Sequence, residues 1–202
     1  MAPVTPNPAH IRDFPDATEF EKWLAANHAG ARELWLKIHK NGSGRPTVSY
    51  AEAVEVALCW GWIDGQRKAF DEHSFLQRFT PRGTKSIWSQ RNVEQIERLM
   101  QAGRMTGHGQ LHVDAAKADG RWQAAYAPGS EMEVPEDLLA AIAGNPAAQK
   151  TFDTLNRQNR FALAFRTNSL KTAAGRQKKI AGFVEMLARG DTLHPNGRGA
   201  KP

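Results

Sequence analysis

Residues 50–92 constrain the fold most, because they encode a capped helix, two strands and a second capped helix in immediate succession. Ser49 and Glu52 have the spacing of a capping box, and Gly61 can close the helix that follows them. The apolar residues of this helix form one stripe, as expected for a helix that packs on a core: Tyr50, Val54, Ala57 and Leu58.

The strand and helix patterns continue on both sides of this helix. Strands are expected at about 33–39, 62–71 and 75–82. Apolar and polar residues alternate in the first, and the third places Phe75, Gln77 and Phe79 on one face. Asp16 is a suitable N-cap for a first helix, and Ser89 for a helix that ends near Gly103. The first part of the chain therefore predicts a small antiparallel sheet with helices.

Beyond Gly120 the patterns become purely helical, and residues 127–130 look like a linker. Ile180, Phe183, Val184 and Leu187 form an i, i+3, i+4, i+7 stripe. We therefore predict an α+β fold, with a small antiparallel sheet and helices followed by a helical C-terminal segment packed on it. The expected divisions are an α+β domain over 1–125, a helical segment over 126–190 and a disordered tail over 191–202.

The composition of the 202 residues is that of a soluble globular protein with an excess of basic residues, and its formal net charge is +6. Residues 154–184 contain seven basic residues and no acidic one, which favours an anionic partner or, alternatively, a solvated basic face. No signal-like apolar start and no run of eighteen apolar residues occur, and Cys59 has no cysteine to pair with. A cytoplasmic protein without membrane insertion is expected.

A first candidate site is the segment before the helix that starts at Ser89. Free backbone N–H groups and the dipole of a helix start favour an anion. Two cations and a hydroxyl lie just upstream, and an indole and an amide could complete such a site: Arg82, Lys85, Ser86, Trp88 and Asn92. The alternative is that the serines only cap the helix while the cations face solvent.

A second candidate is Asp64, which precedes Gly65. Asp-Gly is a turn signal, so Asp64 could simply bond to its own backbone. The functional interpretation places Asp64 in a cleft walled by Trp60 or Trp62, paired with a basic residue, either Lys68 or Arg82. Such a carboxylate could bind a cation or act as a base.

Arg176 falls on the same stripe as Ile180 and Leu187, so we expect it to face inward. An inward guanidinium needs a carboxylate partner, and we predict one from the first part of the chain, with Asp64 as the leading candidate.

His108 and His112 have a spacing that could hold a metal, but no third ligand is evident. No metal or cofactor is expected.

Several motifs resemble those of the bacterial YdeI/OmpD-associated, or bacteriocin-protection, family. They are the stretch 57–65 (ALCWGWIDG), then 79–82 (FTPR) and 85–92 (KSIWSQRN), followed by 116–122, Val134-Pro135 and the helix of Arg176 and Ile180. The resemblance extends over nearly all of residues 14–190. One departure is Gly175, where a Thr is expected in the family. The resemblance implies a link with tolerance to antimicrobial peptides and with an outer-membrane porin, and it implies no catalytic residues.

The leading functional hypothesis is a stress- or bacteriocin-tolerance protein that acts by binding a small anionic ligand or a protein partner. One alternative is an enzyme acting on a small phosphorylated or acidic substrate, with Asp64 as base. Another is a weak nucleic-acid-binding protein that uses the basic C-terminal segment. The predicted ligand-binding residues are Trp62, Asp64, Lys68, Arg82, Lys85, Ser86, Trp88, Ser89, Asn92 and Arg176.

Overall fold

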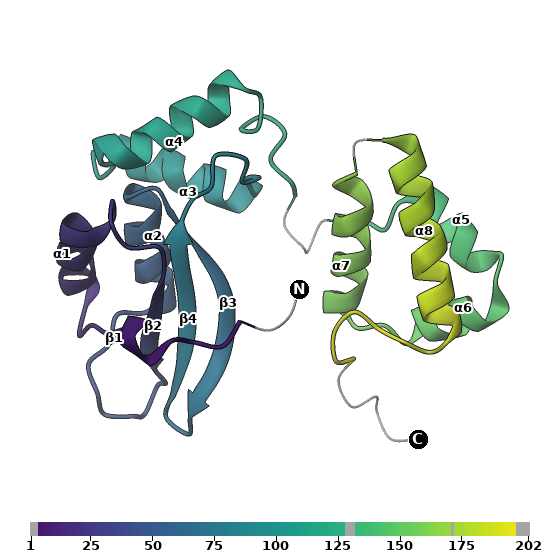
Figure 1. Cartoon of the computed structure of the whole chain (residues 1–202), viewed down its shortest axis with the longest axis horizontal. Coiled ribbons are helices and arrows are strands. Elements are labelled where there is room, and N and C mark those ends of the chain that lie inside the picture. Colours follow the sequence, from purple (N-terminus) through teal and green to yellow (C-terminus); the bar gives the residue numbers. More distant parts are fainter. Residues whose placement is uncertain (1–3, 128–131, 171, 197–202) are drawn as a thin grey trace. The chain divides into compact units, whose positions relative to one another are not determined.

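The computed structural model describes residues 4–127, 132–170 and 172–196. The chain divides into two compact units, Met1–Tyr126 and Ala127–Pro202, each with its own hydrophobic core. The first unit contains a sheet with helices and the described part of the second contains helices only, which confirms the α+β class (Figure 1). The packing of the second unit on the first stays a prediction, and each unit is described below by itself.

The sheet of the first unit has the strand order β1-β2-β4-β3. Its strands are β1 (Ile11–Asp13), β2 (Leu34–His39), β3 (Trp62–Asp71) and β4 (Ser74–Pro81). The antiparallel prediction is correct for β2, β4 and β3 but wrong for β1, which pairs with β2 in parallel. Helix α1 (Ala17–Asn27) provides the crossover that a parallel pair requires. Three residues are too few to show an alternating pattern, so the sequence did not reveal β1.

Four side-chain caps fix where the helices of the first unit begin. Asp16 and Ser49 cap α1 and α2 (Tyr50–Cys59), and the Ser49 capping box is complete. Ser89 caps α3 (Gln90–Gln101), and Thr106 caps α4 (Gly107–Ala118). The Thr106 hydroxyl also donates to the Cys59 carbonyl over 2.6 Å, which ties the start of α4 to the end of α2. A short 3-10 helix, Pro8–His10, precedes β1.

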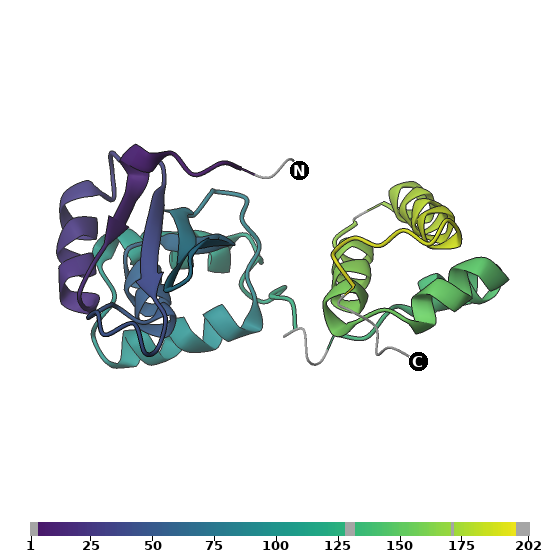
Figure 2. The ribbon, with the colours of Figure 1, turned by 90° about the horizontal axis from the view of Figure 1, so that it is seen from below.

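The core of the first unit lies between the sheet and its helices, which Figures 1 and 2 show gathered around β2, β3 and β4. Alternate residues of β2 and β4 enter this core, among them Leu36 and Phe79, and α1 and α2 contribute Leu24 and Val56. Trp62, the first residue of β3, is fully buried and meets Trp23 edge to face, with 5.9 Å between the ring centroids. The start of β3 is thus anchored in the core.

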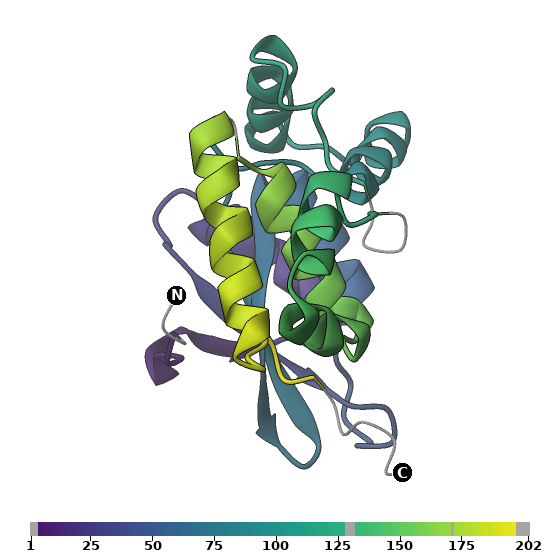
Figure 3. The ribbon, with the colours of Figure 1, turned by 90° about the vertical axis from the view of Figure 1, so that its right-hand side faces the viewer.

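The second unit is a bundle of four helices in its described part: α5 (Glu136–Ala143), α6 (Pro146–Asp153), α7 (Arg157–Asn168) and α8 (Ala173–Ala188). Helix α8 packs against α5, α6 and α7 (Figures 2 and 3). The predicted stripe is correct, because Ile180, Phe183 and Leu187 are buried in the core of this unit. No helix in the described residues is both long and apolar enough to cross a membrane.

The residues after α8 correct one prediction. Disorder was expected from Asp191, but the backbone N–H of His194 donates to Asn159 Oδ1 over 2.9 Å, and Asn196 Oδ1 accepts from Asn156 N over 2.8 Å. Asn159 is buried at the start of α7, and its amide needs the partners that this segment supplies. The rest of the predicted tail, 197–202, and residues 128–130 of the predicted linker lie outside the described residues.

Candidate functional site

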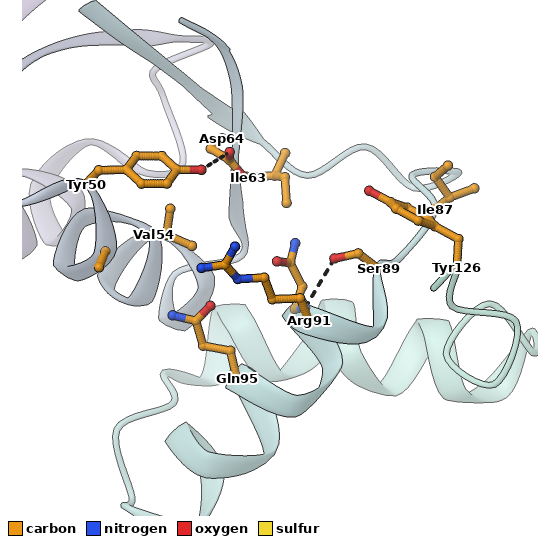
Figure 4. A pocket seen from close by; sticks show the side chains of 11 residues that line it. Tyr50, Val54, Ile63, Asp64, Ile87, Ser89, Arg91, Gln95 and Tyr126 are labelled. Atoms are coloured by element: carbon orange, nitrogen blue, oxygen red, sulfur yellow. Dashed lines mark hydrogen bonds between the residues drawn. The ribbon is translucent and has the colours of Figure 1, made fainter. Parts of the chain in front are cut away.

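A cavity of about 340 Å³ opens in the first unit between α2, β3 and the start of α3. Figure 4 shows its walls, which combine polar groups with a few apolar side chains. The lining residues are Tyr50, Ala51, Val54, Ile63, Asp64, Ile87, Ser89, Arg91, Asn92, Gln95 and Tyr126. Three of the predicted site residues are therefore brought together here: Asp64, Ser89 and Asn92.

Tyr50 and Asp64 form the best-defined polar contact of this cavity. The Ser49 cap makes Tyr50 the first residue of α2, and Asp64 is the third residue of β3. The Tyr50 hydroxyl donates to Asp64 Oδ2 over 2.7 Å (Figure 4). Burial, and then this hydrogen bond to a carboxylate, raise the pKa of Tyr50 well above its usual value. The phenol therefore stays protonated, and it orients the Asp64 carboxylate.

The turn interpretation of Asp64 is wrong, because Asp64 and Gly65 lie inside β3. The register shifts between Asp64 and Arg67, as at a β-bulge, and Gln77 Nε2 donates to the Gly65 carbonyl over 2.9 Å. The expected pairing of Asp64 with Lys68 or Arg82 is wrong as well. Lys68 makes no ion pair among the described residues, and the hydrogen-bond partner of Asp64 is the Tyr50 hydroxyl.

Helix α3 contributes the cationic wall of the cavity through Arg91, with the amides of Asn92 and Gln95 beside it. Arg91 is exposed, and among residues 4–127, 132–170 and 172–196 it has no ion-pair or hydrogen-bond partner for its guanidinium. Figure 4 shows this side chain directed across the cavity toward α2. The cavity therefore holds one carboxylate and one cation that do not pair with each other.

The backbone at the start of α3 is less available to an anion than the sequence suggested. The Asn92 N–H donates to Ser89 Oγ over 3.2 Å, and the Gln90 N–H donates to the Tyr126 carbonyl over 2.9 Å. Lys85 is exposed, and the Ser86 carbonyl accepts from Arg121 over 3.0 Å. The side chains of the cavity, rather than the helix start, carry its binding capacity.

Arg82, Trp88 and Trp62 lie in the core and do not line the cavity. Arg82 is 4% exposed, its guanidinium stacks on Trp88 at 3.6 Å from the ring centroid, and Nη1 donates to the Ile87 carbonyl. Burial, and then the nearby Arg121, lower the pKa of Arg82 to about 10. Its Nη2 and the indole nitrogens of both tryptophans have no hydrogen-bond partner within the described part of the chain. The predicted aromatic cleft is thus a packed interior.

Two family models match the chain. Residues 131–190 match the one described as Bacteriocin-protection, YdeI or OmpD-Associated. Residues 12–112, half of the chain, match the one described as a domain of unknown function (DUF8412). The chain belongs to the DUF8412 family, whereas the bacteriocin-protection model matches residues 131–190 alone. No curated protein and no solved structure matches it.

The predicted resemblance to the bacteriocin-protection family is confirmed for residues 131–190, which lie in the second unit. The motifs 57–65, 79–82 and 85–92, which carried most of the resemblance, fall instead within the stretch matched by DUF8412. The cavity also has most of its lining in that stretch. The family with a functional description and the cavity therefore belong to different units of the chain.

Arg176 belongs to the bacteriocin-protection region, and its predicted partner was wrong. Its Nε and Nη2 donate to the two carboxylate oxygens of Asp137 over 2.6 and 2.9 Å, and Nη1 donates to the Thr167 carbonyl. This bidentate pair joins α8 to α5 within the second unit, and Arg176 lowers the pKa of Asp137. The stripe predicted an inward Arg176, whereas its side chain is 28% exposed, and the stripe could not identify the acid on another helix.

Three histidines of the DUF8412 unit lie in consecutive ring contact. His28 and His108 have centroids 4.6 Å apart, and His108 and His112 are 5.4 Å apart. Trp60, the other predicted wall of the cleft, makes a tilted ring contact with His28, with 4.9 Å between the centroids. In the described residues no group of three or more potential ligands is arranged to hold a metal.

Sequence reasoning missed four polar residues of the cavity: Tyr50, Arg91, Gln95 and Tyr126. Tyr50 was assigned to the core stripe of α2, but it is 41% exposed, because it occupies the first helical position at the edge of that stripe. Arg91 and Gln95 are four apart on α3, so they share a face of that helix. This spacing was the available signal.

Proposed function

We propose that this chain acts in bacteriocin or stress tolerance in the cytoplasm by binding a small anionic ligand in the cavity between Tyr50 and Arg91. The match of residues 131–190 to the bacteriocin-protection family model supports the tolerance role. The observation that supports anion binding is Arg91, a cation without a protein partner among the described residues, on the wall of a cavity. The cytoplasmic location stays a prediction.

The surroundings of Arg91 support recognition of an anionic group. Asn92 and Gln95 offer amide N–H donors on the same wall, and a guanidinium can bind a carboxylate or phosphate through two parallel hydrogen bonds. Val54 and Ile63 supply apolar surface for the rest of a ligand. The volume of about 340 Å³ is near the lower end of the range for ligand pockets, which favours a metabolite-sized molecule.

A binding measurement on the full chain tests the anion site. Sulfate and acetate should raise the melting temperature beyond the effect of chloride at equal ionic strength, and saturation at a hundred times the dissociation constant stabilises by about 2.7 kcal/mol. Arg91→Gln should remove this gain. Arg98→Gln is the matched control, because Arg98 is an exposed arginine of the same helix outside the cavity. Identical responses of both variants and the original chain would show that the site does not bind anions.

The tolerance role needs its own test, because a ligand site alone does not establish it. Bacteria that lack the chain and are supplied with it on a plasmid should survive a bacteriocin challenge better than bacteria with an empty plasmid. The Arg91→Gln chain should restore survival less than the Arg98→Gln chain, at equal protein levels. Full restoration by Arg91→Gln would separate tolerance from the cavity.

A further inference from the structure

The proposed anionic ligand must also accommodate a fixed negative charge in the cavity. Asp64 is only partly exposed, and it lines the same cavity as Arg91. Its Oδ2 is occupied by the Tyr50 hydroxyl, whereas Oδ1 has no hydrogen-bond partner in the part of the chain that the structure describes. One lone oxygen of an oriented carboxylate is an acceptor for an ammonium group.

The charges of the lining residues balance, because Arg91 is the cation and Asp64 the carboxylate in this set. Their side chains do not form an ion pair, although both face one cavity (Figure 4). A simple anion at Arg91 would experience repulsion from Asp64 in a confined space. A ligand with separated opposite charges would instead complement both groups at once.

We infer that the ligand is a small zwitterion, with its carboxylate at Arg91 and its protonated amine at Asp64. This inference rests on the proposed function, whose anion site provides the first of the two contacts. Asn92 and Gln95 would hold the carboxylate together with Arg91. The apolar surface of Val54, Ile63 and Ile87 would receive an aliphatic side chain, so a free aliphatic amino acid is the simplest member of the class.

Three matched compounds test each contact on the unmodified full chain. Leucine carries both charges, 4-methylpentanoate lacks only the amine, and 3-methylbutylamine lacks only the carboxylate. Calorimetric titration should show leucine binding at least about tenfold more tightly than either, since hydrogen bonds between charged groups typically contribute that much. No variant is needed for this comparison, so it does not depend on the folding of a mutant.

Two variants then assign the contacts. Asp64→Asn keeps an acceptor for the Tyr50 hydroxyl and should reduce leucine to the affinity of 4-methylpentanoate, without weakening 4-methylpentanoate itself. Arg91→Gln should weaken leucine and 4-methylpentanoate alike, and Arg98→Gln should change neither.

The outcomes distinguish the inference from the proposed function. If 4-methylpentanoate binds as tightly as leucine, the zwitterion inference is wrong and the anion site stands. If 3-methylbutylamine binds best, both are wrong. If none of the three compounds binds while sulfate or acetate stabilises the chain through Arg91, the inference fails alone.

Discussion

Arg82 is a charged residue that the fold buries almost completely. Its contacts indicate that its aliphatic side-chain carbons contribute more to the stability of the fold than its charge does. The guanidinium lies on Trp88 and makes one hydrogen bond to a carbonyl, while Nη2 remains without a partner in the described residues. Taking such a group out of water is costly, as its lowered pKa of about 10 indicates. The aliphatic stem, by contrast, fills space in a packed core.

We therefore expect Arg82→Met to leave the free energy of unfolding unchanged or to raise it, because Met keeps most of the volume and removes the buried charge. Arg82→Ala should lower the free energy of unfolding by about 2–4 kcal/mol, because it leaves a cavity beneath Trp88. Urea denaturation followed by tryptophan fluorescence measures both. If the two variants are equally destabilised, the guanidinium itself contributes a favourable interaction.

The same residue shows what the sequence could predict about the site. Arg82 and Trp88 were selected because basic and aromatic residues are concentrated around them, but concentration does not distinguish a cleft from an interior. Asp64 lines a cavity, but its hydrogen-bond partner Tyr50 lies on another element, fourteen residues earlier. Pairings of this kind depend on how α2 and β3 pack, which no local spacing encodes.

At the scale of elements, three histidines connect the end of α1 to α4. Burial lowers the pKa of His108 and of His112, and each is lowered further by the neighbouring imidazole, His28 and His108 respectively. Arg82 and Arg121 also disfavour a charge on His112. The folded state therefore binds fewer protons than the unfolded state, in which these groups titrate near 6.5. The contribution of these two histidines to the free energy of unfolding should therefore be fully present above pH 6.5 and should fall as the pH drops below that value.

We predict that His112→Gln flattens the dependence of unfolding free energy on pH between 7 and 5. Chemical denaturation at several pH values in that window measures the slope. His73→Gln is the control, because His73 lies exposed in the turn between β3 and β4, outside the three-histidine contact. A slope that is the same in both variants and in the original chain would show that the cluster does not titrate in this range.

The elements that the sequence predicted are those whose signals are local. Caps at Asp16, Ser49 and Ser89, and the stripe on α8, identified helices correctly, and the alternation of apolar and polar residues identified β2 and β4. Helix α7 was not predicted, because its buried residues include the consecutive run 162–164 rather than a spaced stripe. The contacts of such a helix come from the surrounding bundle rather than from its own pattern.

At the scale of the whole molecule, the two units have separate cores of unequal size. Among the described residues, the core of the first contains 21 buried residues, including Trp62 and Phe79, and that of the second contains nine, including Leu163. A single core in a unit of about 75 residues seldom supplies more than about 3–5 kcal/mol. The second unit is therefore expected to be the less stable of the two.

The distribution of tryptophan allows a test on the intact chain, because all six tryptophans lie within residues 23–122 of the first unit. Tryptophan fluorescence should therefore report the first unit, whereas far-ultraviolet circular dichroism reports the helices of both. We predict that in urea the dichroism signal begins to fall at a lower concentration than the fluorescence changes. Leu163→Ala, which truncates a fully buried side chain of the second core, should move the early part of the dichroism curve and leave the fluorescence midpoint in place. Coincident curves by both probes, shifted together by Leu163→Ala, would show instead that the chain unfolds as one cooperative body.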